Sequence, residues 1–148
     1  MIRKATMKDC KPLSVLAYRS KAYWGYSDEF MASCKTDLEV NEEDIEQKWV
    51  YLAEEKGQLQ GFYCLEPFKQ HLDALFIDPD SIGNGLGKVL WQDLLQKAKE
   101  NKIKSFTLDS EPHATPFYEK MGAIIIGETT SSVFPERTLP LMQMKLET

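Results

Sequence analysis

The sequence predicts a single mixed α/β domain. Near the middle of the chain, the apolar run 72–77 leads through Asp78-Pro79 into a glycine-rich turn and a helical run over 86–99. A second apolar strand, 105–108, and a second helical run, 114–121, follow. Such strand–helix units indicate α/β architecture. The length of 148 residues fits one domain, and the 43% hydrophobic content is enough for a substantial core.

The other elements follow from alternation, helical spacing and caps. The predicted strands are 2–4, 49–53, 59–65, 72–77, 105–108, 124–128 and 139–145. The turn around Glu55-Lys56-Gly57 makes a hairpin of the second and third strands. Asp9 and Ser27 are expected to cap the first two helices, and Asn41 a short turn over 42–45. The result is about seven strands and about four helices.

Composition excludes several classes of function. No segment is long and apolar enough to cross a membrane, and the N-terminus lacks an apolar signal region. The three cysteines lack Cys-x-x-Cys spacing and the two histidines lack ligand spacing, so we expect no disulfide and no metal. A formal charge of −5 without a basic stripe argues against nucleic acid. We therefore expect a cytoplasmic monomer or homodimer without membrane contact.

The glycine-rich turn is the most informative segment. Gly83, Gly85 and Gly87 alternate just before an apolar helical run. Backbone N–H groups in such a turn can converge, and the helix N-terminus adds partial positive charge. The turn therefore predicts an anion site, most plausibly for phosphate or pyrophosphate.

Two common phosphate motifs do not match. The Walker loop requires glycine at Ile82 and Ser or Thr at Val89. The dinucleotide fingerprint requires glycine at Lys88 or at Leu90, depending on the register. These failures argue against a nucleotide hydrolase and against a Rossmann cofactor.

The segment resembles motif A of the GNAT superfamily, the acyl-CoA-dependent N-acyltransferases, in which Arg/Gln-x-x-Gly-x-Gly/Ala follows a strand. Ile82 stands where the family usually has Arg or Gln. The segment 110–123 resembles GNAT motif B, with His113 near the usual Asn and Ala123 in place of the usual Phe. The two motifs lie in the family's order, and the resemblance spans essentially the whole chain.

The resemblance implies one GNAT domain over residues 1–148, with a central, mostly antiparallel mixed sheet. It implies an N-acetyltransferase that moves acetyl from acetyl-CoA to a primary amine of a small molecule or a protein, by direct attack in a ternary complex. A non-catalytic CoA-binding module of the same fold is the alternative. The cofactor residues that it implies are Leu75, Phe76, Ile77, Ile82, Gly83, Asn84, Gly85, Leu86, Gly87, Lys88, Ser110, Phe117 and Tyr118.

Within that frame, Tyr118 is expected to protonate the departing CoA thiolate. The candidates for general base are His71 and Asp73, two residues apart on one strand and therefore expected on one face. Glu66, Glu111 and ordered water are the other options. Family loops that wall the acceptor site correspond here to segments that contain Trp24, Tyr26 and Arg137.

Overall fold

The computed structural model describes residues 1–146. The strands are β1 (Ile2–Lys4), β2 (Trp49–Glu55), β3 (Gln58–Glu66), β4 (His71–Ile77), β5 (Ser105–Asp109), β6 (Ile124–Thr130) and β7 (Thr138–Lys145). The α-helices are α1 (Cys10–Ala22), α2 (Asp28–Cys34), α3 (Glu42–Gln47), α4 (Leu86–Glu100) and α5 (Thr115–Lys120). Short 3₁₀ turns cover Met7–Asp9, Pro79–Ser81 and Pro112–Ala114. Within this part of the chain, no helix is long and apolar enough to span a bilayer.

The predicted mixed α/β fold is confirmed, with one helix more than expected. Asn41 caps α3, where the sequence predicts only a turn, because its side chain accepts a hydrogen bond from Asp44 N–H at 3.0 Å. Ser27 caps α2 as expected, accepting from Phe30 N–H at 3.1 Å. Asp9 precedes α1, but its carboxylate turns back to the Thr6 N–H at 2.7 Å.

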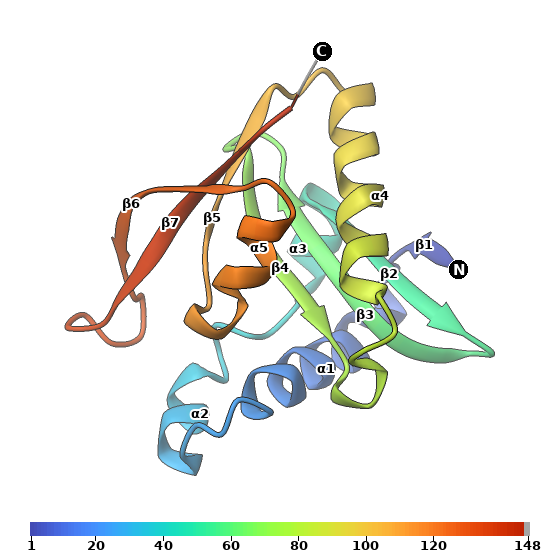
Figure 1. Ribbon diagram of the computed structural model, residues 1–148. Coiled ribbons are helices and arrows are strands. Elements are labelled where there is room, and N and C mark those ends of the chain that lie inside the picture. The colour runs from blue at the N-terminus through green and yellow to red at the C-terminus, as the bar shows by residue number, and fades with distance from the viewer. Residues whose placement is uncertain (147–148) are drawn as a thin grey trace.

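The seven strands form one sheet in the order β1-β2-β3-β4-β5-β7-β6 (Figure 1). β4 and β5 pair in parallel, and the other neighbouring strands pair antiparallel. The parallel pairing covers only His71 opposite Thr107 and Leu72 opposite Leu108. Beyond these residues the two ribbons part toward the bottom of the view, with α5 in front of the gap (Figure 1).

Helices cover both faces of the sheet, and each layer encloses a core. On one face, α4 contributes Trp91 and Leu94 to a cluster with Phe106 of β5 and Met142 of β7. On the other, Leu13 and Leu16 of α1 pack against β2 and β3. Both faces of β4 are therefore covered, and its side chains alternate between the two cores.

A β-bulge interrupts this alternation. Leu72 pairs with Leu65 and Ala74 with Cys64, so Asp73 is an extra residue on β4. After it, Leu75 packs with Leu72 on the α4 side, and Ala74 on the α1 side. A bulge bends its strand and increases the local twist. It lies just where β4 leaves β5.

Gly61 lets β3, β4 and α4 approach one another. A Cβ at this position would lie 2.9 Å from the Phe76 carbonyl oxygen and 3.1 Å from a Leu90 methyl group. Because one of these neighbours is backbone, the structure cannot yield by turning a side chain. Glycine at position 61 thus allows β3 and β4 to pair here while Leu90 of α4 packs over them.

We expect Gly61→Ala to destabilise the protein by about 1–3 kcal/mol, the usual cost of overpacking a core. Urea unfolding measures this. Gly127→Ala is the matched control, since Gly127 lies in a strand with nothing within 4 Å of its Cβ position. Equal stability of the two variants would contradict the packing role.

Candidate functional site

A cavity of about 570 Å³ fills the space where β4 and β5 diverge. Its lining includes residues 72–77 of β4, the glycine-rich turn, the end of β5, the 3₁₀ turn before α5, the inner side of α5 and Trp24 of the α1–α2 loop. Beyond Leu72, the β4 edge that faces β5 has no strand partner. Backbone N–H and C=O groups of successive strand residues point to opposite edges. Asp78 N–H bonds to Gln60 O at 2.8 Å, so Phe76, opposite Phe62, also faces β3, whereas Leu75 and Ile77 present their backbone groups to the free edge along one wall. An extended ligand could add to this edge as a further strand would.

The glycine-rich turn forms one end of the cavity. Gly83 and Gly85 have φ of 93° and 74°, which favour glycine, and their Cβ positions have no neighbour within 4 Å. No described residue accepts a hydrogen bond from the N–H groups of residues 83–88; Val89 N–H is the next donor, to Gly85 O at 3.2 Å. The turn caps the 15-residue helix α4, so free N–H groups and the helix dipole coincide.

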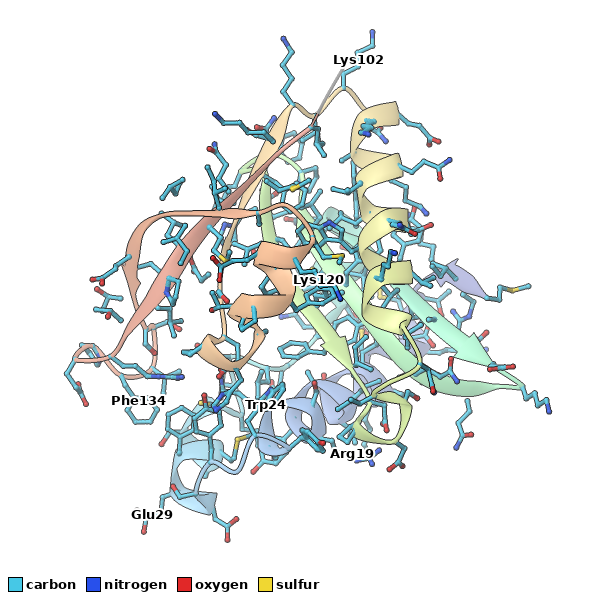
Figure 2. The ribbon with its side chains drawn as sticks, in the orientation of Figure 1. Arg19, Trp24, Glu29, Lys102, Lys120 and Phe134 are labelled. Atoms are coloured by element: carbon cyan, nitrogen blue, oxygen red, sulfur yellow. The ribbon has the colours of Figure 1, made fainter. Side chains whose placement is uncertain are left out.

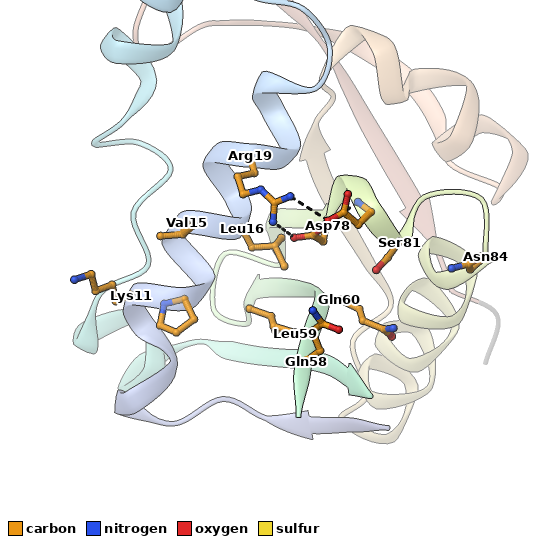
Figure 3. A pocket seen from close by; sticks show the side chains of 12 residues that line it. Lys11, Val15, Leu16, Arg19, Gln58, Leu59, Gln60, Asp78, Ser81 and Asn84 are labelled. Atoms are coloured by element: carbon orange, nitrogen blue, oxygen red, sulfur yellow. Dashed lines mark hydrogen bonds and ion pairs between the residues drawn. The ribbon is translucent and has the colours of Figure 1, made fainter. Parts of the chain in front are cut away.

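The third glycine serves a different purpose. A Cβ on Gly87 would lie 3.2 Å from the Phe117 ring, so Gly87 allows α4 to pack closely against α5. Ile82 and Lys88 line the cavity, together with Leu86. Asn84 lines a different cavity, on the far side of the turn (Figure 3).

That second cavity shows how the turn is held from behind. Arg19 of α1 donates to Asp78, which precedes the turn, at 2.6 Å (Figure 3). Asp78 in turn accepts from Asp80 N–H at 2.9 Å. This connection fixes the entry of the turn against α1.

Tyr118 is nearly buried and lines the cavity beside Phe117. Its hydroxyl has no hydrogen-bond partner among the residues described. Burial, and secondly the charge of Glu111, raise the pKa of Tyr118. The phenol is therefore protonated and free to donate into the cavity.

Ser110 does not line the cavity, in contrast to the expected cofactor contact. It is fully buried, and its hydroxyl bonds to Glu111 O at 3.0 Å and to Thr115 Oγ1 at 2.8 Å. Its place in the structure is to shape the connection between β5 and α5.

The two candidate bases on β4 are engaged separately. His71 Nδ1 lies 2.8 Å from Thr107 Oγ1, and its Nε2 lies 3.7 Å from Asp109. Asp73 lines the cavity but pairs with Lys48 at 2.9 Å. Asp73 is also the bulge residue, so the strict alternation behind the expected shared face does not hold.

A cluster of polar residues, which we call the Glu111 cluster, lies at the mouth of the cavity. Its members are Lys21, Tyr26, Glu111, His113 and Arg137. Glu111 accepts from the Tyr26 hydroxyl, from Lys21 at 3.2 Å and from His113 Nδ1 at 2.7 Å. Arg137 donates to the Tyr26 hydroxyl at 2.9 Å. The expected acceptor residues Tyr26 and Arg137 are thus in direct contact.

Aromatic rings enclose this cluster. Trp24 stacks on His113 with ring centroids 4.9 Å apart, and Phe30 stacks between Tyr26 and Phe134. Figure 2 shows Trp24 between α1 and the start of α5, and Phe134 near α2. Trp24, Glu111 and His113 line the cavity. The sequence pointed to Trp24, but treated His113 only as a motif position and Glu111 as a weak option for the base.

Hydrogen bonds fix the charge of Glu111. Burial opposes ionisation, but the hydrogen bonds from Tyr26 and His113 and the charge of Lys21 outweigh it and lower the pKa of Glu111. Burial and the Glu111 hydrogen bond raise the pKa of Tyr26 to about 12. At neutral pH, Glu111 is a carboxylate that only accepts hydrogen bonds.

Comparison with known proteins identifies the family. The acetyltransferase (GNAT) domain model matches residues 9–148. A 5-NmdU N-acetyltransferase of Pseudomonas phage PaMx11 is 25% identical over 133 residues, which cover 87% of this chain and 90% of the relative. The peptidyl-lysine N-acetyltransferase YjaB of Escherichia coli is 38% identical over 81 residues, 55% of this chain and 52% of the relative.

Solved structures agree. The chain superimposes on a GCN5-related N-acetyltransferase from Rhodopseudomonas palustris with a TM-score of 0.84 at 22% identity, covering 99% and 95% of the two chains. PaiA N-acetyltransferase from Thermoplasma acidophilum, solved with coenzyme A, gives 0.81 at 22% identity and 98% of each chain. The chain therefore belongs to the GNAT acetyltransferase family and is an acyltransferase.

The lowered pKa of Glu111 links the cluster to stability. A carboxylate with a depressed folded pKa contributes stability above its ordinary pKa of 4.5, and this is lost as the pH falls through the folded value. We expect Glu111→Gln to be less stable at neutral pH and to lose less stability on acidification. Urea unfolding between neutral pH and about pH 3 measures this.

Glu119→Gln is the control for that series. Glu119 is an exposed carboxylate on α5, outside the ion pairs found in residues 1–146. The unfolding free energy of Glu119→Gln should vary with pH as that of the unaltered protein does. The same profile for Glu111→Gln would contradict the stabilising role of the cluster.

Proposed function

We propose that the protein transfers the acetyl group of acetyl-CoA to a primary amine by direct attack in a ternary complex. The observation that carries the proposal is the cavity itself. It runs from the unpaired N–H groups of residues 83–88, along the free edge of β4, to Tyr118 and the Glu111 cluster. Each stretch suits one part of the reaction.

The residues present fit acetyl-CoA. The N–H groups of the turn, with the dipole of α4, suit the pyrophosphate. The backbone groups that Leu75 and Ile77 present at the free edge suit the amide groups of the pantetheine arm. A β4 N–H would donate to the thioester carbonyl and stabilise the oxyanion that forms there.

The amine nitrogen attacks the thioester carbon, forming the N–C bond as the carbonyl becomes an oxyanion. Collapse then breaks the C–S bond, and the thiolate takes a proton from Tyr118. The nitrogen loses its extra proton to solvent and becomes a neutral amide, and the tyrosinate takes up a proton from solvent. No cysteine appears among the described cavity residues, and Cys34 and Cys64 are buried elsewhere. Direct attack therefore suits this site better than an acyl-cysteine route.

The energetics of Tyr118 set a condition on this step. An ordinary phenol giving its proton to an ordinary thiolate is uphill by about 2 kcal/mol. Burial raises the pKa of Tyr118 and so increases this cost. The same cavity desolvates the thiolate and makes it a stronger base, which offsets the increase.

Three carboxylates, those of Asp73, Asp109 and Glu111, line the cavity, against two lysines, Lys88 and Lys120. This excess of carboxylates suits a cationic amine better than an anionic acceptor. Relatives with amine acceptors in their names, among them peptidyl-lysine and aminoglycoside N-acetyltransferases, support the same class. A cytoplasmic monomer or homodimer that binds no nucleic acid and needs no metal stays a prediction.

The turn should decide cofactor binding. Gly85→Ala places a Cβ in the open space that the pyrophosphate approaches and strains a positive φ. We expect the affinity for CoA, measured by calorimetry, to fall about tenfold or more, which is about 1.4 kcal/mol or more.

Gly57→Ala separates this effect from backbone strain. Gly57 has a similar φ of 76°, also with no neighbour within 4 Å, but lies in the β2–β3 hairpin outside the cavity. Both variants should lose about 1–2 kcal/mol of stability, and only Gly85→Ala should lose CoA. Undiminished affinity in a folded Gly85→Ala protein excludes the turn as the pyrophosphate site.

Tyr118→Phe tests the chemistry. A panel of primary amines is screened for CoA release, with acetylated product identified by mass spectrometry. We expect the variant to lose about 10²–10⁴-fold in turnover while its CoA affinity changes little. Full turnover of the variant where chemistry limits the rate removes Tyr118 as the acid. Equal losses of turnover and CoA affinity would mean that Tyr118 only shapes the pocket.

A further inference from the structure

A second acid–base group lies at the acceptor end of the cavity. His113 sits in the 3₁₀ turn before α5, and its ring lines the cavity in contact with Trp24 and Glu111. Its side chain is 43% exposed, so the ring meets both the cavity and solvent. Nothing in the proposed transfer so far uses it.

Glu111 determines which nitrogen of this ring carries the proton. Glu111 Oε1 lies 2.7 Å from His113 Nδ1, and an ionised carboxylate can only accept a hydrogen bond. Nδ1 is therefore the protonated nitrogen of the neutral ring. No described residue hydrogen-bonds to Nε2, so its lone pair is available.

We propose that His113, held by Glu111, is the general base that removes a proton from the acceptor ammonium before attack. This inference rests on the proposed acetyl transfer and names a residue of the same site. The ammonium gives one proton to His113 Nε2 and becomes a neutral amine with a free electron pair. The imidazolium then releases that proton to solvent through its exposed face.

The other candidates fit this task less well. Both nitrogens of His71 face oxygen atoms of β5, and His71 does not line the cavity. Asp73 is paired with Lys48. Glu66 accepts from the Lys69 N–H in the β3–β4 turn, outside the cavity.

The surroundings of His113 support proton transfer in both directions. Glu111 stabilises the imidazolium, while Lys21 of α1 and Arg137 of the β6–β7 loop share the charge of that carboxylate at 3.2 and 3.7 Å. The Tyr26 hydroxyl also lies near the ring, 3.4 Å from His113 Nδ1. The carboxylate is thus partly compensated, which limits how firmly it would retain a protonated ring.

Chemical rescue tests the proposal with the full-length protein, acetyl-CoA and the best amine from the panel. His113→Ala should lower kcat about 10²–10⁴-fold and leave CoA affinity unchanged. Added imidazole should restore at least about tenfold, because it can fill the space left by the ring and take up the proton. The loss of turnover in His113→Ala should also become smaller as the pH approaches the pKa of the acceptor ammonium, about 10 for a lysine-like acceptor. At that pH much of the amine is already neutral and needs no base.

His71→Ala is the rival variant in the same assay. A larger loss and rescue at His71 than at His113 would overturn the proposal, as would a defect of His113→Ala that neither imidazole nor alkaline pH relieves. If the wild-type protein releases CoA with none of the amines, the proposed acetyl transfer is refuted, and the role of His113 as base with it. Turnover by the wild type together with full activity of His113→Ala refutes the base alone.

A second measurement does not depend on turnover. Nitrogen-15 NMR of the neutral His113 ring should show the proton on Nδ1 in the unaltered protein. Glu111→Gln should shift the ring toward a mixture of tautomers, because an amide can donate as well as accept. A neutral ring protonated mainly on Nε2 in the unaltered protein would overturn the assignment.

Discussion

The short parallel contact between β4 and β5 is the constraint on which the site depends. A parallel pair normally continues along its strands, but here it stops after two residues. The bulge at Asp73 reverses the faces of β4 and bends it away. The parting strands leave a polar edge that must be satisfied by a ligand or by water. A structural irregularity of one residue thus opens the cavity that the rest of the site uses.

Packing behind the glycine-rich turn fixes its conformation. Gly83 and Gly85 take positive φ values that favour glycine, whereas Gly87 lets Phe117 of α5 approach α4. Arg19 holds the entry to the turn through Asp78. The three glycines look alike in the sequence, but they are needed for two different physical reasons. Gly83 and Gly85 are needed for their positive φ, and Gly87 for its close contact with Phe117. Both ends of the turn are thus fixed, at α1 through Asp78 and at α5 through Gly87.

The sequence predicted the elements well because their patterns are local. Alternation, caps and glycine spacing act within a few residues, and the turn and the order of elements along the chain follow from them. Tyr118 was identified by the resemblance to GNAT motif B. The bulge at Asp73 could not be predicted, since it depends on how β3 and β4 pair. Ser110 looked like a cofactor contact from its place in a motif, but it is fully buried. The Glu111 cluster was missed as a unit because its hydrogen-bonded members, such as Tyr26 and Arg137, lie up to 111 residues apart.

Glu111 joins the architecture of the acceptor site to its chemistry. The carboxylate ties α1, the α1–α2 loop and the β6–β7 loop to the start of α5, either directly or through Tyr26. It also fixes the proton on His113 Nδ1. A carboxylate with a single histidine partner would attract an imidazolium strongly and slow its deprotonation. Because Lys21 of α1 and Arg137 of the β6–β7 loop share this carboxylate, the contacts that assemble the proposed acceptor site also weaken that attraction. Assembly of that site and release of the proton from His113 therefore depend on one group.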